Sequence, residues 1–202
     1  MAIHQLFPQP VCFSKLERKL TKKELTTIDT YQAKTYKNEG NLTSKDNYVL
    51  ENKPLKNLKK DLNKAVIDYF NEVVCANNSI TPYITQSWIN YTETNQFHHK
   101  HSHSNSYVSG VFYIDAKKEV DHIIFNKSGY QQLKLSIAQA NQFNSMVWKC
   151  SVQTSDVILF PSTLMHEVFP KEGTNTRISL SFNVFFKGKI GTAERLTELV
   201  LE

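Results

Sequence analysis

The segment RISLSFNVFF, residues 177–186, alternates polar and apolar side chains with the two-residue period of a β-strand. One face of this strand carries Arg177, Ser179, Ser181 and Asn183. The opposite face carries Ile178, Leu180, Phe182 and Val184. If the apolar face packs against helices, the polar face lines the inside of a barrel or sandwich. An arginine on that face favours a small anionic ligand there, because its planar fork can hold a carboxylate through two hydrogen bonds.

Further short segments have the composition of strands, being rich in β-branched and aromatic residues and bounded by polar or turn residues. They are ITQSWINYT (84–92), SYVSGVFYI (106–114), HIIFN (122–126), MVWKC (146–150) and DVILF (156–160). We therefore expect at least six strands. A sandwich or barrel is the most economical way to close so many short strands.

The N-terminal part, residues 1–80, is predicted to be mainly helical. Apolar residues recur there at three- and four-residue steps, as on one face of a helix that has Pro54 in its first turn: Leu55, Leu58, Leu62, Val66, Tyr69, Phe70 and Val73. We also expect a shorter helix around residues 22–37 and a last one in TAERLTELVL (192–201), with Thr192 as its N-cap. The order of elements predicts one α+β, mainly β domain over residues 1–202, with residues 81–190 as the β core.

Composition excludes several classes of protein. Hydrophobic residues make up 40% and charged residues 21% of the 202 residues, which argues against a disordered, collagen-like or coiled-coil chain. The net charge of +5 arises largely from SKLERKLTKKE (14–24) and KPLKNLKKDLNK (53–64), which are typical of solvated helix faces. Nucleic acid is therefore not the expected partner.

The N-terminus has no basic segment followed by an apolar run, and no stretch approaches the roughly 18 apolar residues of a membrane span. We expect neither a cleaved signal nor a membrane partner. Cys12, Cys75 and Cys150 are scattered and odd in number, which is a poor disulfide framework. We expect three buried thiols and a cytoplasmic protein.

Four histidines are crowded into FHHKHSHSNS, residues 97–106, a pattern typical of metal binding. In an extended chain His101 and His103 point to the same face, while His98 points to the opposite one. His166 is a candidate third ligand because it follows a buried strand and a Pro-Ser turn. The H-x-H pair taken alone is equally compatible with a His-rich surface loop.

The order of H-x-H, a distal histidine, and an arginine followed two residues later by serine resembles the 2-oxoglutarate/iron(II)-dependent oxygenases. Within that superfamily, the phrases SWIN (87–90), HSHSNSYVSGVFYI (101–114), ILFPSTLMHEV (158–168) and RISLSFN (177–183) are similar to a family of 2-oxoglutarate oxygenases common in phage and marine bacterial genomes. The opening LFPQPV (6–11) is also similar, so the resemblance covers most of the chain.

The resemblance implies a double-stranded β-helix, or jelly roll, with Fe(II) held by His101, His103 and His166. It implies that Arg177 and Ser179 hold the distant carboxylate of 2-oxoglutarate. The surrounding pocket is expected to include Asn90 and Tyr113, together with Trp88 and Tyr107. The implied reaction uses O₂ as co-substrate and couples decarboxylation of 2-oxoglutarate to succinate with hydroxylation of an unidentified small molecule or protein. The location is then the cytoplasm, or the host cytoplasm for a phage protein.

One departure from the superfamily is His103, which stands where the usual third ligand is a carboxylate. Three neutral imidazoles would leave the iron site one unit more positive. Glu93 or Asp115 could supply the missing charge, although we expect neither to do so, and Glu167 could orient His166.

Two other functions stay open at this stage. One is a cupin-like dioxygenase with three histidines and no 2-oxoglutarate, which would not need Arg177 and Ser179. The other is a non-catalytic metal-binding β-sandwich, which a closed fourth ligand such as His99 would favour.

Overall fold

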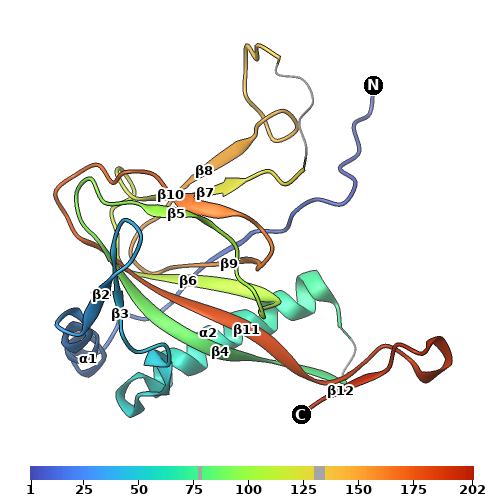
Figure 1. Ribbon diagram of the computed structural model, residues 1–202, viewed down its shortest axis with the longest axis horizontal. Coiled ribbons are helices and arrows are strands. Elements are labelled where there is room, and N and C mark those ends of the chain that lie inside the picture. Colours follow the sequence, from blue (N-terminus) through green and yellow to red (C-terminus); the bar gives the residue numbers. More distant parts are fainter. Residues whose placement is uncertain (77–78, 130–134) are drawn as a thin grey trace.

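A computed structural model describes residues 1–76, 79–129 and 135–202 (Figure 1). The helices are α1 (Lys22–Gln32) and α2 (Lys56–Tyr69). The strands are β1 (Cys12–Lys15), β2 (Thr35–Lys37), β3 (Leu42–Ser44), β4 (Ile80–Thr92), β5 (His98–His101), β6 (Val108–Asp115), β7 (His122–Asn126), β8 (Val147–Ser151), β9 (Asp156–Pro161), β10 (His166–Val168), β11 (Arg177–Ile190) and β12 (Leu199–Leu201). No helix among these residues is long and apolar enough to cross a bilayer.

The strands form two antiparallel sheets that pack face to face. The major sheet has the order β1-β9-β6-β11-β4-β3-β2, and β12 pairs with the far end of β11. The minor sheet has the order β5-β10-β7-β8. Figure 1 shows the two sheets as two layers, with α2 against the face of the major sheet that points away from the minor sheet. The expected mainly β sandwich with supporting helices is therefore present, and residues 1–80 also contribute three strands to it.

Strand β11 is the central strand of the major sheet, and its alternating pattern decides what lies on each side. Its apolar residues Leu180, Phe182 and Val184 are fully buried in one core cluster with the α2 residues Leu58 and Leu62. Burying each such side chain contributes about 1.5–3 kcal/mol. Its polar residues therefore face the minor sheet, so that the same strand covers the core on one side and a cavity on the other.

Helix α2 begins after two 3₁₀ turns, Val49–Glu51 and Lys53–Leu55, and Pro54 lies in the second of them. A π-helical turn, Phe70–Val74, extends the helix at its end. The wider π-turn moves Val73 off the buried stripe, because its hydrogen bonds span five residues instead of four. Val73 is 39% exposed, so its expected place in the stripe is wrong, while the other members of the stripe are buried.

Helix α1 is shorter than predicted. Thr21 and Glu24 form a capping box at its start, and it ends at Gln32. The remaining residues that we expected to be helical include Thr35–Lys37, which form β2 and pair with β3. Pairing at the sheet edge overrides local helix propensity there.

The predicted helix over residues 192–201 is wrong. Its residues form a 3₁₀ turn, Ala193–Arg195, followed by β12, and Thr192 makes no side-chain cap. Positive φ angles at Gly191 and Leu196 allow the chain to fold back, and β12 then pairs with residues 188–190 of β11. The segment has few buried side chains, so no packed apolar face stabilises a helix.

The cysteines are all free and are less buried than predicted. Cys12 and Cys150 are half-buried and pack at the edges of the two core clusters. Cys75 is exposed, so the expectation of three buried thiols is wrong for it. The reason is its position directly after the π-turn, where a φ of 50° turns the chain away from the core.

Candidate active site

A pocket of about 460 Å³, including its open mouth, lies between the two sheets. Its lining comes from β4, β6, β9 and β11 of the major sheet and from β5, β7 and β10 of the minor sheet. Among the predicted site residues, the lining includes three histidines, two further polar residues and the Arg-Ser pair: His101, His103, His166, Asn90, Tyr113, Arg177 and Ser179. The structure thus brings together residues that are widely separated in the sequence.

His101, His103 and His166 form one compact group. His101 on β5 is the direct cross-strand partner of His166 on β10, and their ring centroids are 4.3 Å apart. His103 follows β5, with its ring 4.9 Å from His101 and 5.1 Å from His166. One nitrogen from each ring lies within 4.8 Å of the others. This arrangement is close enough for a single ion to gather all three rings.

Backbone contacts decide which nitrogen two of these rings present to the pocket. His101 Nδ1 donates to the His99 carbonyl oxygen at 2.8 Å, and His166 Nδ1 donates to the Leu164 carbonyl oxygen at 3.0 Å. Each ring therefore carries its proton on Nδ1 and leaves the Nε2 lone pair available. These backbone acceptors fix both the tautomer and the ring orientation that a metal requires.

Burial keeps the three imidazoles neutral. Desolvation lowers the pKa of His166 to about 3 and that of His103 to about 4, and it also lowers the pKa of His101. Neutral imidazole is the form that binds a transition metal. The donor set therefore fits a divalent metal such as Fe(II).

These shifts predict a pH dependence for the metal-free protein. Imidazoles in the unfolded chain titrate near pH 6.5. Below that pH the unfolded state therefore binds protons, while the rings of His103 and His166 in the folded state stay unprotonated. The stability that the neutral rings provide is fully present above about pH 6.5 and is lost as the pH falls toward 4 and then 3. Urea unfolding at pH 7.5 and pH 5.5 should show the loss. A His103→Asn/His166→Asn variant should lose less stability, and an equal loss would contradict the assignment.

Arg177 lies at the start of β11 and is buried deep in the pocket. One terminal nitrogen donates to the His122 carbonyl oxygen and the other donates to Thr92 Oγ1, both at 3.1 Å. Its Nε is buried and has no hydrogen-bond partner among the described residues. Burial lowers its pKa, but a guanidinium stays charged in proteins.

No carboxylate pairs with Arg177 among the described residues. The nearby Asp121 is engaged instead by Lys171, 3.5 Å away, and by the backbone N–H of Lys117. Asp121 acts on Arg177 only through its charge, and a buried cation without a directly paired carboxylate is costly unless an anion completes it. This end of the pocket therefore fits the carboxylate of a small ligand.

Strand register explains why the polar residues converge. Arg177, Ser179 and Ser181 on β11 stand directly opposite Thr92, Asn90 and Trp88 on β4, respectively. On the other side of β11, Tyr113 of β6 stands opposite Ser179. Asn90 Nδ2 donates to Ser181 Oγ at 3.1 Å, which fixes the amide. Burial raises the pKa of Tyr113, so its phenol stays protonated and can donate.

Sequence reasoning missed Thr92 as a partner of Arg177. The pattern that could have found it is the alternation in SWINYT, which puts Trp88, Asn90 and Thr92 on one face of β4.

His98 lies in the pocket, although strict alternation predicts the opposite face. Its ring stacks on that of His101 with centroids 4.6 Å apart. The reason is a bulge in β5: His98 and His101 pair with Val168 and His166, so the three-residue step on β5 opposes a two-residue step on β10. An extra residue of this kind reverses the side-chain alternation.

Tyr107 does not line the pocket, which corrects that expectation. It is 46% exposed and packs between Phe70 and Phe186, with ring centroids 5.9 Å and 5.4 Å away. It lies just before β6, outside the strand pairing that directs Tyr113 inward.

The alternative carboxylates lie outside the histidine group. Glu93 and Asp115 are exposed at strand ends and do not line the pocket. Glu167 does line it, but its Oε1 accepts from Asn126 Nδ2 at 2.9 Å, and the Nδ1 of His166 is occupied by a backbone carbonyl. Glu167 therefore does not orient His166. Among the described residues, both groups of side chains close enough to share an ion consist of histidines alone.

Comparison with known proteins gives one family and many related structures. Residues 86–183 match the family described as "Putative 2OG-Fe(II) oxygenase". No curated protein matches the chain.

Three solved structures illustrate the likeness. A prolyl hydroxylase from Trichoplax adhaerens in complex with a hypoxia-inducible-factor peptide has a TM-score of 0.58 at 13% identity, covering 87% of this chain and 83% of its own. A Pseudomonas putida prolyl-4-hydroxylase has a TM-score of 0.58 at 11% identity, with coverages of 87% and 92%. HygX from Streptomyces hygroscopicus, with nickel, 2-oxoglutarate and hygromycin B bound, has a TM-score of 0.55 at 11% identity, with coverages of 87% and 82%. At identities this low, the TM-scores establish a shared fold alone, and the predicted jelly roll is confirmed.

Proposed function

We propose that the protein is a 2-oxoglutarate- and Fe(II)-dependent dioxygenase whose site is the pocket between the two sheets, because residues 86–183 match the family of 2OG-Fe(II) oxygenases. The observation that carries the proposal is the pairing of two features in one pocket. The neutral imidazoles of His101, His103 and His166 lie close together in the pocket. The buried guanidinium of Arg177, which has no directly paired carboxylate among the described residues, also lines the pocket.

In this proposal His101, His103 and His166 hold the iron. Arg177 and Ser179 bind the distant carboxylate of 2-oxoglutarate, with Asn90 and Tyr113 at its side. When bound, iron and 2-oxoglutarate supply oxidative decarboxylation to succinate, with O₂ as co-substrate, coupled to oxidation of a substrate C–H bond.

The protein's own residues bind the co-substrate, orient it and exclude water from the pocket. The carbonyl of His122 and the hydroxyl of Thr92 hold the guanidinium of Arg177 in place before any ligand arrives, so little ordering is required on binding. Burial keeps the phenol of Tyr113 protonated by raising its pKa, so that its hydroxyl is available to donate a hydrogen bond to the ligand. The buried side chains of Ile123 and Phe160 make part of the pocket wall apolar, and an apolar wall strengthens the attraction of Arg177 for an anion.

The prime substrate is a small molecule or a protein, and hydroxylation is the proposed outcome. The solved relatives include one with a peptide and one with hygromycin B, which supports both classes equally. The proposal takes residues 1–202 as a single oxygenase domain. It places the protein in the cytoplasm, or in the host cytoplasm for a phage protein, consistent with three free cysteines.

The two alternative functions have less support. A cupin-like dioxygenase has no use for a buried, unpaired Arg177 beside Ser179. A closed structural metal site needs a fourth ligand, and among the described residues the group containing His103 and His166 has only His101 as its third member. An open coordination position favours catalysis.

Anaerobic titration of the metal-free protein with Fe(II) and 2-oxoglutarate tests the proposal. A visible metal-to-ligand charge-transfer band should grow and saturate at one equivalent of each. Succinate in place of 2-oxoglutarate is the control, because it lacks the keto group of the chelate. If the protein binds Fe(II) but 2-oxoglutarate produces no band, the proposed function is wrong.

A further inference from the structure

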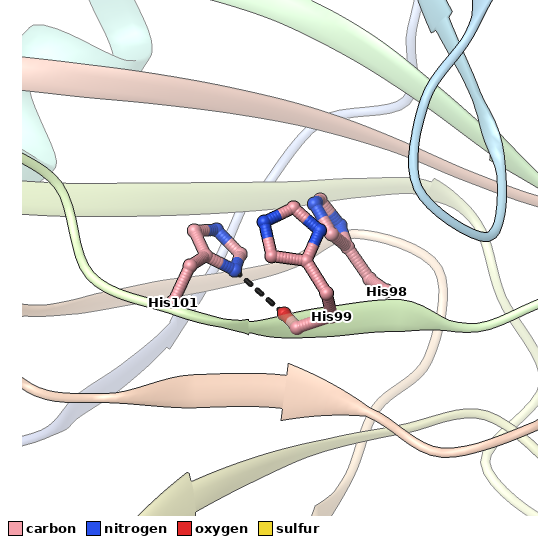
Figure 2. Close-up of side chains that lie close together, drawn as sticks. All are labelled: His98, His99 and His101. Atoms are coloured by element: carbon pink, nitrogen blue, oxygen red, sulfur yellow. Dashed lines mark hydrogen bonds between the residues drawn. The ribbon is translucent and has the colours of Figure 1, made fainter.

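A second group of three histidines lies beside the first. His98, His99 and His101 place one ring nitrogen each within 4.8 Å of one another. Their ring centroids are 4.6–5.2 Å apart, compared with 4.3–5.1 Å in the first group. Figure 2 shows the three rings gathered on one side of β5, with the bond from His101 Nδ1 to the His99 carbonyl oxygen drawn as a dashed line.

The bulge in β5 creates this second group, since regular alternation would separate His98 from His101. The turn between β2 and β3 lies against it. Asn38 Nδ2 is 3.4 Å from His98 Nε2, and Glu39 Oε2 is 3.8 Å from His99 Nδ1. That Nδ1 atom is buried and has no hydrogen-bond partner among the described residues. A carboxylate this close places an oxygen donor beside a cluster of imidazole donors.

His101 belongs to both groups but has only one nitrogen to offer. Its Nδ1 is bound to the His99 carbonyl oxygen, so its Nε2 can ligate one ion at a time. The first group therefore loses a ligand whenever the second is filled.

We propose that His98, His99 and His101 form a second metal-binding triad, suited to Zn²⁺, that cannot be filled together with the triad of His101, His103 and His166. Three imidazoles form a common donor set for Zn²⁺, which takes a fourth ligand from water or a carboxylate. Glu39 is close enough to serve as that ligand or as an outer partner of His99. The consequence, that zinc in the second triad prevents iron from binding, rests on the proposed function.

Calorimetric titration with Zn²⁺ alone tests the second triad. The His103→Ala/His166→Ala variant removes two donors of the first triad and should still bind one Zn²⁺ per chain. Adding His98→Ala and His99→Ala should weaken that binding roughly 100-fold or more, since loss of a mere outer partner costs about 10–100-fold. His4→Ala in the same background is the matched control, because it removes an exposed histidine elsewhere. If the four-alanine variant binds zinc like the two-alanine variant, the second triad does not exist.

The wild type tests the sharing of His101. It should bind one Zn²⁺ per chain, and a stoichiometry of two would overturn mutual exclusion. Circular dichroism establishes that the variants are folded.

A measurement that needs no first-triad variant adds Zn²⁺ to the wild-type Fe(II)–2-oxoglutarate complex and to the same complex of His98→Ala/His99→Ala. The charge-transfer band should need at least tenfold more zinc to disappear in the variant. Equal sensitivity would overturn the inference, whereas a band missing from the wild-type complex before zinc is added would overturn the proposed function instead.

Discussion

Replacing Arg177 by leucine is expected to weaken 2-oxoglutarate binding roughly 30-fold to several thousandfold. The side chain keeps similar bulk, but the pocket loses its only buried cation among the lining residues. Removing one partner of a buried, hydrogen-bonded charge pair costs about 2–5 kcal/mol. Calorimetric titration of 2-oxoglutarate into the metal-loaded variant measures the effect directly.

Metal binding should survive this substitution, because Arg177 belongs to neither group of histidines that could hold an ion. Lys187→Leu is the matched control: it removes an exposed cation from the same strand and should leave 2-oxoglutarate affinity unchanged. Arg177→Lys keeps the charge but loses the planar fork, so its affinity should lie between those of the wild type and the leucine variant. An unchanged affinity in Arg177→Leu would show that the carboxylate binds elsewhere.

The second large effect is expected at His103. His103→Ala should lower Fe(II) affinity roughly 100-fold or more, since it removes a ligand rather than an outer partner, whose loss costs about 10–100-fold. His103→Asp restores the carboxylate of the usual triad and supplies a negative charge, so it should bind Fe(II) far better than alanine does. Fe(II) titration and succinate formation should both rank the wild type and the aspartate variant above the alanine variant.

The matched control for this series is Ser102→Ala, which changes an exposed residue between two candidate ligands. It should behave as wild type. If His103→Ala binds Fe(II) and forms succinate like the wild type, His103 is not a ligand. The third donor would then have to come from His98 or His99, the histidines nearest to His101.

Local patterns predicted the elements that the core depends on. The alternation in residues 177–186 predicted both faces of β11, and the spacing of Leu58, Leu62 and Val66 predicted α2. These patterns are readable because each follows from burial on one face of a regular element. The convergence of His101, His103 and His166 was anticipated from the family resemblance, although His103 lies just after β5 and not on the strand as the H-x-H pattern suggested.

Features that depend on departures from regular geometry could not be predicted in this way. The bulge that turns His98 inward depends on pairing between β5 and β10, two segments far apart in the sequence. The π-turn that exposes Val73 and the hairpin that replaces the C-terminal helix are likewise set by neighbouring structure. Residue type alone does not encode the strand register that places Thr92 opposite Arg177.

The bond from Arg177 to the carbonyl of His122 joins the major sheet to β7 of the minor sheet. The guanidinium proposed to bind 2-oxoglutarate therefore also links the two sheets of the sandwich. The aromatic pair Phe125 on β7 and Phe160 on β9, whose ring centroids are 5.1 Å apart, also packs between the two layers. We expect a change in the size of either ring to alter the gap between the layers and so to shift the hydrogen bond of Arg177. If Arg177 binds 2-oxoglutarate as proposed, core substitutions that never touch the ligand should therefore change the affinity of the protein for 2-oxoglutarate.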